Sequence, residues 1–374
     1  MGVGRLGRRR GRGPLKTSPV ARKKEVRKLL TELGAKIYDD INSGIFPEIS
    51  MPSRSVRNIV YDKDLKQYVV GQNIVKRSSK NIKHIRPFTQ TIWLAFFVEK
   101  LLREGKTSTL RDVYYSAQAF NIDFKDQAES DEIITDLEAL LRKAREDYNV
   151  YPEERSAIYG DLTIEYTVPG HEGKRLNLVS HPDGYLIGPS LSTAELVKTS
   201  AKVVFAVEKG GLFTRFVENK VHEKYKALIV DTAGQPPRST RYFLRRLNQE
   251  LGLPIYVLTD ADPYGMHIFM VIASGSANAA HLTELTVPTA KWVGVTATDI
   301  ETYKLPHVKL KDEDIKRAYE LKNDPRYKDA MFQKELDMFI KKQKKAELEA
   351  FSKYSLDYIV DKYLPDKLKE IDKN

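Results

Sequence analysis

The feature that most constrains the fold is a series of short apolar segments after about residue 195, separated by stretches with helical spacing. Three segments are apolar throughout and have the length of strands: 203–207, 227–230 and 255–258. Three helical patterns separate or follow them: 212–219, 240–251 and 266–273. Continuous apolar strands that alternate with helices are typical of a parallel sheet buried on both faces. The sequence therefore predicts an α/β domain over 195–374, completed by helices beyond residue 309.

Each of these three strands runs into an acidic residue. Glu208 follows the first strand, Asp231 follows the second, and Asp260 and Asp262 follow the third. Carboxyl ends of parallel strands meet at one edge of a sheet, which is where open α/β sheets bind ligands. We therefore expect these acids to converge.

Gathered carboxylates repel each other unless a cation lies between them, and Mg²⁺ prefers such oxygen ligands. A bound Mg²⁺ neutralises charge that develops during phosphoryl transfer. An isolated Asp-x-Asp is more often a surface turn, but its place in this series favours a metal site. We predict Glu208, Asp260 and Asp262 as Mg²⁺ ligands acting on a nucleic acid. Asp231 is equally well explained as a cap for the loop 232–234, and we expect His267 to pack.

Residues 85–168 predict a helix-turn-helix with a wing. A helix is expected over 89–102 with Pro87 in its first turn, and a second begins at Thr109 with Asp112 completing a capping box. An acidic helix follows over 131–147. The alternation of apolar residues over 162–168 then predicts the strand of the wing. The fold class is thus α/β plus winged helix.

Two adjacent tyrosines lie on the second of these helices. Leu110, Val113 and Tyr114 share one apolar stripe with Ala117, which places Tyr114 in the core. Tyr115 faces the other way, one turn after Arg111. A phenol has a pKa near 10, so a nucleophilic tyrosine needs help with its proton or with negative charge, and a guanidinium supplies the latter. We predict Tyr115 as nucleophile and Arg111 as its helper. The alternative is an exposed aromatic that only stacks on DNA.

Length and charge bound the function. A chain of 374 residues is long enough for two globular units. Its net charge of +11 is concentrated in residues 1–30, which contribute +10, and a second basic block over 51–111 carries +9. Residues 112–150 carry −6. The block that includes Lys106 and Arg111 is expected to bind DNA phosphates, unless it is only a solvated surface.

Several classes of protein are excluded by what the sequence lacks. There is no cysteine, which rules out thiolate chemistry and disulfides. The longest apolar run, 92–98, is too short for a membrane span. No Gly-x-x-x-x-Gly-Lys-Ser/Thr loop is present, so we expect no P-loop ATP site. We expect an intracellular, nucleoid-associated protein.

The region before the predicted DNA-binding unit has three parts. Residues 1–18 are rich in Gly and Arg and predict a disordered basic arm. Residues 21–43 predict an amphipathic helix that docks either on its own chain or on a partner. Short extended segments follow around 57–61 and 67–70. The expected division is 1–18 arm, 19–70 helix and extended segments with a possible contact to another protomer, 71–170 winged-helix domain, and 195–374 metal-binding domain.

Several motifs carry a resemblance to a known family. Glu208, the following strands and Asp260-Ala261-Asp262 are similar to the Toprim fold of topoisomerases, primases and some nucleases. Five motifs, in order, resemble the A subunit of topoisomerase VI, of archaeal type, and its eukaryotic relative, the meiotic double-strand-break transesterase: 111–115, 207–211, 240–247, 260–265 and 291–300. The resemblance covers about residues 70–370.

The resemblance implies a function for both units. A winged-helix domain would carry Tyr115, and a Toprim domain would carry Glu208, Asp260 and Asp262. Two copies of the chain would form a homodimer on double-stranded DNA, with one tyrosine working beside the partner's Mg²⁺ and a 5′-phosphotyrosyl link on each strand. A separate B subunit would bind ATP, and two copies of each subunit would form an A2B2 assembly. This assembly would relax and decatenate DNA as a type II (IIB) topoisomerase.

Three alternatives remain open at the level of sequence. A meiotic-type enzyme would break DNA without resealing it, which strand-passage assays with a B subunit distinguish. A Toprim nuclease would use water, and its cleavage would survive Tyr115→Phe. A winged-helix DNA-binding protein with an inert α/β domain would show no cleavage.

Overall fold

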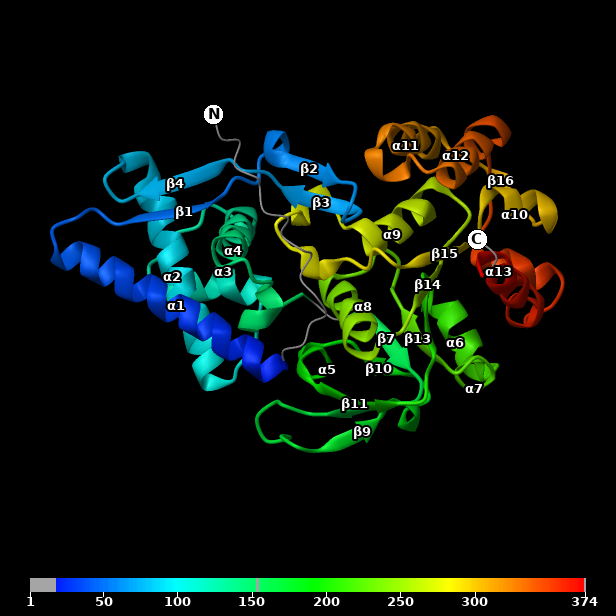
Figure 1. Ribbon diagram of the computed structural model, residues 1–374, viewed down its shortest axis with the longest axis horizontal. Helices are drawn as coiled ribbons and strands as arrows, with labels where there is room; N and C mark the ends of the chain where they lie inside the picture. The colour runs from blue at the N-terminus through cyan, green and yellow to red at the C-terminus, as the bar shows by residue number, and fades with distance from the viewer. Residues whose placement is uncertain (1–17, 153–154, 373–374) are drawn as a thin grey trace, which may run out of the picture.

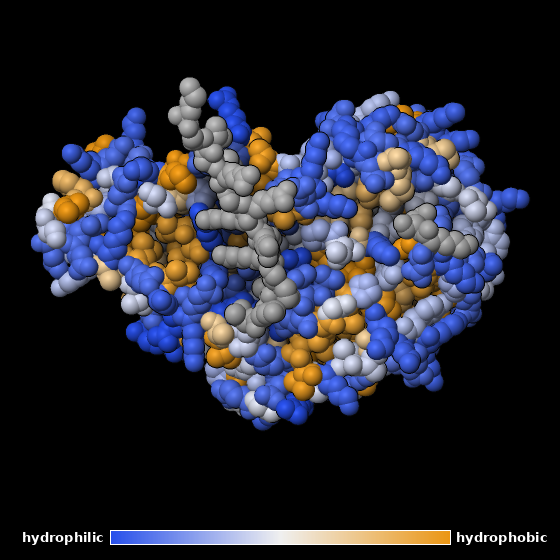
Figure 2. All heavy atoms as spheres, in the orientation of Figure 1, coloured by the Kyte–Doolittle hydropathy of each residue, from blue (hydrophilic) through white to orange (hydrophobic). Residues whose placement is uncertain are grey.

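The computed structural model describes residues 18–152 and 155–372, so the predicted basic arm lies almost entirely outside the described residues. Figure 1 shows a helical unit at the N-terminal side and a larger sheet-containing unit beside it. Hydrophilic residues dominate the face seen in Figure 2, with an apolar group over α1 (Pro19–Asn42) and α2 (Ile82–Glu104). No helix within the described ranges combines the length and the apolar character needed to cross a membrane.

The larger unit is built on a six-stranded sheet with the order β10-β7-β13-β12-β14-β15. Its strands are β7 (Ala157–Tyr159), β10 (Tyr185–Leu186), β12 (Val203–Val207), β13 (Ala227–Asp231), β14 (Ile255–Leu258) and β15 (Lys291–Gly294). The last four are parallel, as predicted, and their side chains are almost all buried. The sheet is mixed, however, because β7 and β10 add antiparallel strands at the β13 edge.

Helices cover both faces of this sheet, as continuous apolar strands require. The helices α6 (Gly210–Glu218), α7 (Val221–Lys224) and α13 (Leu364–Ile371) lie on one side of the sheet in Figure 1. On the other side lie α8 (Arg238–Leu251) and α9 (Pro263–Ser274). The reversal of strand order between β13 and β14 sends successive helices to opposite faces. The carboxyl ends of β12 and β14 are therefore neighbours at one edge.

The remaining helices and strands of this unit lie around that sheet. They are β8 (Leu162–Glu165), β9 (Arg175–Asn177), α5 (Pro189–Thr193), β11 (Glu195–Thr199), α10 (Ala297–Thr302), β16 (Val308–Lys309), α11 (Asp312–Asn323), α12 (Ala330–Lys342) and β17 (Lys344–Lys345). The strand predicted as a wing is β8. It pairs with β9 and β11 in a separate three-stranded sheet, and Leu162 and Ile164 belong to the large core.

These pairings correct two expectations from sequence. The segment 162–168 is not a hairpin of the helical unit, since its apolar side chains are buried by the α/β unit. Likewise β7, which the expected boundary at residue 170 assigned to the DNA-binding domain, hydrogen-bonds to β13. Alternation along a strand predicts that one face is buried, but it does not say which neighbour buries it.

The helical unit consists of α2, α3 (Leu110–Ala119) and α4 (Gln127–Leu141), with the short parallel pair β5 (Ser108–Thr109) and β6 (Val150–Tyr151). Leu94, Val98, Val113, Ile134 and Leu137 lie in its core and are fully buried. The predicted end of α2 near Gly105 is confirmed, because this glycine takes the left-handed C-cap conformation.

The predicted start of α2 was wrong. The helix begins at Ile82, because the Asn81 side chain accepts a hydrogen bond from the Lys83 N–H (3.0 Å), and Pro87 lies inside the helix. The acidic helix α4 also begins earlier than expected, with Asp126 as its cap, and ends at Leu141, where Arg142 takes a left-handed conformation. A side-chain cap fixes a helix start more strongly than a proline in the sequence.

The N-terminal helix α1 docks on its own chain. Val26 and Leu30 are buried in the core of the helical unit, and Ile37 packs with Ile49 and Phe88. Two hairpin-like pairs follow it: β1 (Glu48–Pro52) with β4 (Ile74–Ser78), and β2 (Ile59–Asp62) with β3 (Gln67–Val70). The alternative that sequence left open, docking on a partner, is therefore not needed to explain this apolar stripe.

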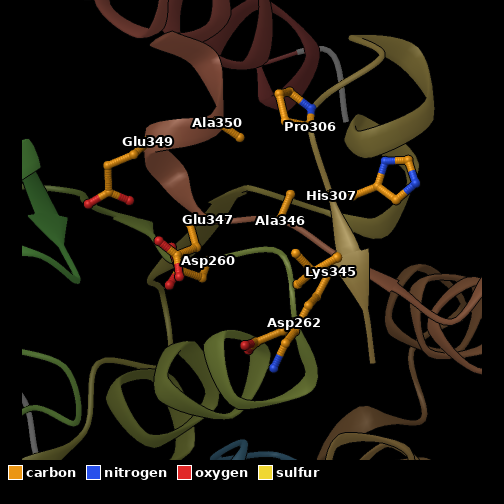
Figure 3. A pocket seen from close by; sticks show the side chains of 10 residues that line it. Asp260, Asp262, Pro306, His307, Lys345, Ala346, Glu347, Glu349 and Ala350 are labelled. Atoms are coloured by element: carbon orange, nitrogen blue, oxygen red, sulfur yellow. The ribbon is translucent and has the colours of Figure 1, made fainter. Parts of the chain in front are cut away.

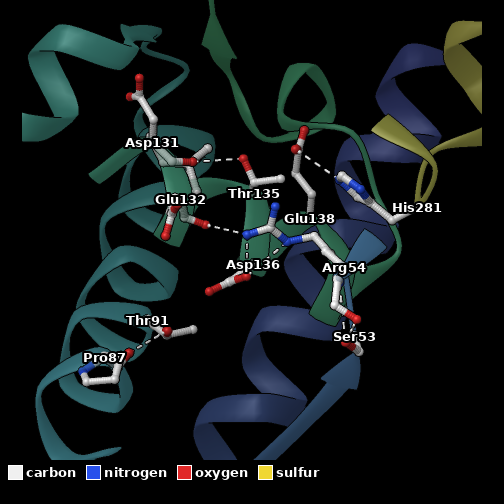
Figure 4. A network of polar contacts seen from close by, with 12 residues as sticks. Ser53, Arg54, Pro87, Thr91, Asp131, Glu132, Thr135, Asp136, Glu138 and His281 are labelled. Atoms are coloured by element: carbon white, nitrogen blue, oxygen red, sulfur yellow. Dashed lines mark hydrogen bonds and ion pairs between the residues drawn. The ribbon is translucent and has the colours of Figure 1, made fainter. Parts of the chain in front are cut away.

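The two units are connected by contacts far apart in the sequence. In the β2–β3 hairpin, the Tyr68 hydroxyl donates to Asp324 (3.3 Å) and Arg326 lies over the Tyr68 ring. Glu138 of α4 is completely buried and binds Arg145, Arg238 of α8 and His281, as Figure 4 shows for His281. A buried carboxylate that lost these partners would be costly, so Glu138 joins the units firmly.

The basic block of the sequence is partly neutralised within the chain. Arg54 and Arg77 both bind Asp136 of α4, and Arg86 binds Glu129 (2.8 Å). The abrupt change from basic to acidic residues after Arg111 therefore reflects ion pairs between neighbouring elements. The positive charge available to a phosphate is smaller than the count along the sequence suggested.

Candidate active site

The carboxyl ends of β12 and β14 bring Glu208 and Asp260 into direct contact. The Asp260 N–H donates to the Glu208 Oε2 at 2.9 Å, and the Glu208 N–H donates to the Leu258 carbonyl at 3.0 Å. Continuous apolar strands force the first polar residue to appear where each strand leaves the sheet. The predicted convergence of these two acids is therefore observed.

Asp262 lies at the start of α9, where it caps the helix. Its Oδ1 accepts a hydrogen bond from the Gly265 N–H at 2.7 Å. A side chain at position 265 is excluded, because a Cβ there would lie 2.2 Å from the Asp260 carbonyl oxygen. This close approach of the α9 N-terminus holds Asp260 and Asp262 at the edge of the sheet.

The three carboxyl groups carry poorly compensated charge. Burial and the nearby charge of Asp260 raise the pKa of Glu208 to about 7. Burial also raises the pKa of Asp260, although the Leu348 N–H and Lys209 oppose the shift. The pKa of Asp262 is raised by burial against the opposing effect of the Gly265 N–H. A cation between these groups would restore their charged forms.

The C-terminal segment completes this edge with residues that the sequence analysis missed. Ala346 pairs with Ala261, and the Leu348 N–H donates to Asp260 (2.8 Å). A cavity of about 330 Å³ is lined by Asp260 and Asp262 together with Lys345, Glu347 and Glu349 of this segment. Figure 3 shows Glu347 beside Asp260, and Lys345 beside Asp262. No local sequence pattern at 345–349 predicts that the segment lies beside Asp260, because the segment is positioned by the β-bridge between Ala346 and Ala261.

Lys209 balances part of the negative charge. Its ammonium lies 3.0 Å from the Asp260 Oδ2, 3.2 Å from Glu347 and 3.1 Å from Glu349. Although burial opposes the shift, the hydrogen bond and charge of Asp260 raise the pKa of Lys209. The lysine follows Glu208 directly in the sequence, and this adjacency is the signal that could have identified it.

The donor set fits a hard divalent cation. Mg²⁺ prefers oxygen ligands such as these strand-end carboxylates, and its charge would offset the repulsion and burial that raise their pKa values. Within the described residues, no three His, Asp or Glu side chains are already arranged around one point for a metal ion. Asp260 is instead engaged by Lys209, so cation binding requires the carboxylates to turn toward each other.

Tyr115 and Arg111 lie on the outer face of α3, as the helical spacing predicted. Tyr115 is 52% exposed, and the Arg111 guanidinium carbon lies 5.7 Å from the centre of its ring. Tyr114 packs against the core of the helical unit, and the Thr109–Asp112 capping box fixes the start of the helix. The structure therefore confirms the predicted orientation of the two tyrosines.

Three further residues from the sequence analysis have defined surroundings. Lys106 is exposed and its ammonium lies 3.2 Å from Glu104. Asp231 accepts a hydrogen bond from the Ala233 N–H at 2.9 Å and so caps its loop. His267 lies 3.4 Å from the Tyr327 hydroxyl, and burial with Arg317 and Arg326 nearby lowers its pKa to about 4.

Comparisons with known proteins agree with this geometry. Residues 203–368 match the family model of the Toprim domain that the topoisomerase 6 A subunit shares with Spo11, and residues 86–150 match that of type IIB DNA topoisomerase. The first match covers the parallel strands and the three acids, so the larger unit is a Toprim domain. The second covers α2, α3 and α4.

Full-length relatives extend the match to nearly the whole chain. The A subunit of type 2 DNA topoisomerase 6 from Methanothermobacter thermautotrophicus is 43% identical over 92% of this chain and 97% of the relative. The proteins of the same name from Archaeoglobus fulgidus and Halobacterium salinarum are 39% and 35% identical, over 90% and 93% of this chain and 94% and 96% of theirs. Continuous identity at this level, across both units, leaves one assignment. The chain belongs to the family of type 2 DNA topoisomerase 6 A subunits.

Proposed function

We propose that this chain cleaves both strands of DNA as the A subunit of a type IIB topoisomerase, with Tyr115 as the nucleophile. The observation that carries the proposal is the presence of two complementary half-sites on one chain. An exposed tyrosine beside an arginine lies on α3, and three half-buried carboxylates lie at the edge of the Toprim sheet. Neither half is sufficient for transesterification alone.

In the proposed reaction the Tyr115 oxygen attacks a DNA phosphorus. The bond from phosphorus to the 3′ oxygen breaks, the phenol proton is lost, and the released 3′ oxygen gains a proton to become a hydroxyl. The product is a phosphotyrosine on the 5′ end. One phosphodiester replaces another, so the step is readily reversed and the break can be resealed. Arg111 stabilises the negative charge on the phenolate and on the attacked phosphate.

Glu208, Asp260 and Asp262 would hold Mg²⁺, the cation that Toprim domains typically bind. When bound, the cation would supply positive charge to the phosphate and the leaving oxygen. Lys209 would neutralise Asp260 until the cation takes its place. The helical unit, as a winged-helix domain, would present α3 to the duplex.

The partners follow from the family and the charge. Double-stranded DNA is the substrate, a homodimer of this chain provides two tyrosines, and a B-type ATPase subunit completes an A2B2 assembly. We propose that Tyr115 of one chain works beside the carboxylates of the other, because Tyr115 is exposed and makes no contact with its own Toprim acids. Lys106 and Arg111 would contact the DNA backbone.

Mixed dimers test this arrangement. Chains with Tyr115→Phe are combined with chains carrying Glu208→Ala, together with the B subunit, ATP and Mg²⁺. If the two halves come from different chains, the mixed dimer retains one intact site and forms a covalent link to one strand. If both halves come from one chain, the mixed dimer has no intact site. Denaturant trapping on labelled duplex, followed by digestion, identifies the linked residue.

A further inference from the structure

We propose that the cleft between α3, the first turn of α8 and the middle of α9 binds one phosphate group through Arg241. This is a site separate from the Toprim carboxylates. The assignment of the phosphate to DNA rests on the proposed function, whereas the binding of a phosphate as such does not.

The cleft is built almost entirely from basic, polar and small apolar residues. Its volume is about 580 Å³, and α3 contributes Arg111 while α8 contributes Arg238 and Arg241. Arg155 and His267 also line it, and among the described residues no Asp or Glu does. Four arginines without an acid among the lining residues form a concave surface of one sign, which favours an anion.

Arg241 is the decisive residue of the cleft. It is only 8% exposed, and its Nε and Nη1 are buried without a hydrogen-bond partner among the described residues. Arginine is never neutral at ordinary pH, and a buried guanidinium with open donors is costly unless an anion binds it. Its planar fork of N–H groups matches the oxygens of a phosphate.

The neighbouring arginines show why Arg241 forms no ion pair with an acid among the described residues. Glu138 is fully buried and binds both Arg145 and Arg238. The Glu146 carboxylate lies 3.4 Å from the Arg238 Nε and attracts Arg241 only from a greater distance. Burial and the charge of Arg238 lower the pKa of Arg241 to about 10, which is the effect expected of an uncompensated cation.

The start of α8 adds backbone donors to the same cleft. Pro237, which precedes the helix, provides no side-chain cap, and Pro236 and Pro237 both line the cleft. A helix of fourteen residues without a side-chain cap leaves N–H groups of its first turn available, and its dipole favours an anion there. Arg241 lies one turn into this helix, so both features act on the same volume.

The position of the cleft favours a DNA phosphodiester as the source of the phosphate. Arg111 lines the cleft and also lies 5.7 Å from the centre of the Tyr115 ring. Arg111 could therefore contact a phosphate in the cleft and the Tyr115 ring at the same time. In this position Arg241 would hold the DNA backbone between the helical unit and the Toprim domain of one chain.

The first experiment measures binding of a labelled duplex to the full chain in EDTA, over a range of salt concentrations. Arg241→Gln is compared with Arg245→Gln, which removes the same charge one turn further along α8 and does not line the cleft. Loss of one phosphate contact should lower the slope of log affinity against log salt by about 0.9. Affinity should fall about tenfold for Arg241→Gln and stay near wild type for Arg245→Gln.

The second experiment measures thermal unfolding with inorganic phosphate against chloride at equal ionic strength. Phosphate should raise the wild-type Tm but not that of Arg241→Gln. Without phosphate the variant should unfold at a higher temperature than wild type, since an unpaired buried charge has been removed. A lower Tm for the variant, with no response of the wild type to phosphate, would show a structural arginine and overturn the site.

The outcomes distinguish a DNA phosphate from a free phosphate as the ligand, and they distinguish the Arg241 site from the proposed DNA cleavage. A phosphate response with an unchanged duplex slope would support the phosphate site and overturn its assignment to DNA. Neither measurement requires cleavage, so Tyr115→Phe should give the wild-type slope and Tm response. A chain that fails to cleave DNA but shows the Arg241 effect would contradict the proposed function alone.

Discussion

The two halves of the proposed active site are held in opposite physical environments. Tyr115 lies on the surface of a short helix, 52% exposed, with one arginine beside it. Glu208, Asp260 and Asp262 lie at the end of a buried sheet, where burial raises the pKa of each. The exposed half can be approached by another molecule, whereas the carboxylates of the other half are partly buried and must turn toward each other to hold a cation. This difference is why we propose that a second chain and a cation complete the active site.

The largest expected effect concerns the exposed half. Tyr115→Phe removes only the nucleophilic oxygen and should lower DNA cleavage by at least about 10³-fold, since no other group can form the covalent link. Duplex binding should stay at the wild-type level. Covalent complexes are measured by denaturing gel, and Tyr114→Phe is the matched control, expected to cleave normally. Cleavage that persists in Tyr115→Phe would show that the exposed half of the site does not supply the nucleophile.

The buried half should respond to loss of charge rather than loss of a nucleophile. Glu208→Gln and Asp260→Asn keep the side-chain size and should lower Mg²⁺-dependent cleavage by about 10²- to 10³-fold. Excess Mg²⁺ should rescue them partly. Asp231→Asn is the control, because among the described residues the Asp231 side chain hydrogen-bonds only within its own loop, and the variant should leave cleavage within a few fold of wild type. An equal loss of cleavage in Asp231→Asn would mean that the acids affect cleavage by stabilising the fold and not by holding a metal ion.

The raised pKa of Glu208 predicts how the metal-free protein responds to pH. Its folded pKa of about 7 exceeds the ordinary value of 4.5, so the folded state binds an extra proton between these values. Stability is therefore highest below about pH 4.5 for this group and falls as pH rises to about 7, by up to about 3 kcal/mol. Unfolding in EDTA at pH 5.5 and 8 measures the change.

Glu208→Gln is the control for this pH effect, since it removes the titrating group and should flatten the profile. Mg²⁺ favours the charged carboxylate, so saturating metal should also reduce the fall in stability at higher pH. The surface tyrosine should play no part, and Tyr115→Phe should reproduce the wild-type profile. A profile unchanged in Glu208→Gln would mean that another group titrates.

The smallest effects are expected from exposed basic residues near the tyrosine. Arg111→Gln should slow cleavage of bound DNA about tenfold, because one charge that stabilises the phenolate and phosphate is lost. Lys106→Gln should only reduce the salt dependence of duplex binding, with a slope change of about 0.9, and leave cleavage of bound DNA unchanged. Single-turnover cleavage at saturating enzyme concentration distinguishes an effect on the cleavage rate from an effect on DNA binding. A larger loss in Lys106→Gln than in Arg111→Gln would reverse their assigned roles.

Much of the fold was predictable because local patterns and burial agree. The strands at 203–207 and 255–258 were predicted with their observed bounds, since apolar residues throughout a short segment leave few alternatives. The Thr109–Asp112 cap and the outward face of α3 followed from spacing alone. The start of α2 was not predicted, because the cap six residues before Pro87 outweighs the signal of the proline. The partner of β8 was not predicted either, because it lies in a strand distant along the sequence.

The sequence by itself identified Tyr115 and the strand-end acids as candidate residues and determined the faces of the elements that carry them. Those properties depend on residue type and on periods of 2 and 3.6, which are local. Only the tertiary structure decided which charges are neutralised and which are not. It pairs Arg54 and Arg77 with Asp136, brings Glu347 and Glu349 to Asp260, and leaves the Nε and Nη1 of Arg241 without a hydrogen-bond partner among the described residues. Electrostatic energy depends on distance and burial in space, and neither is encoded by position along the chain.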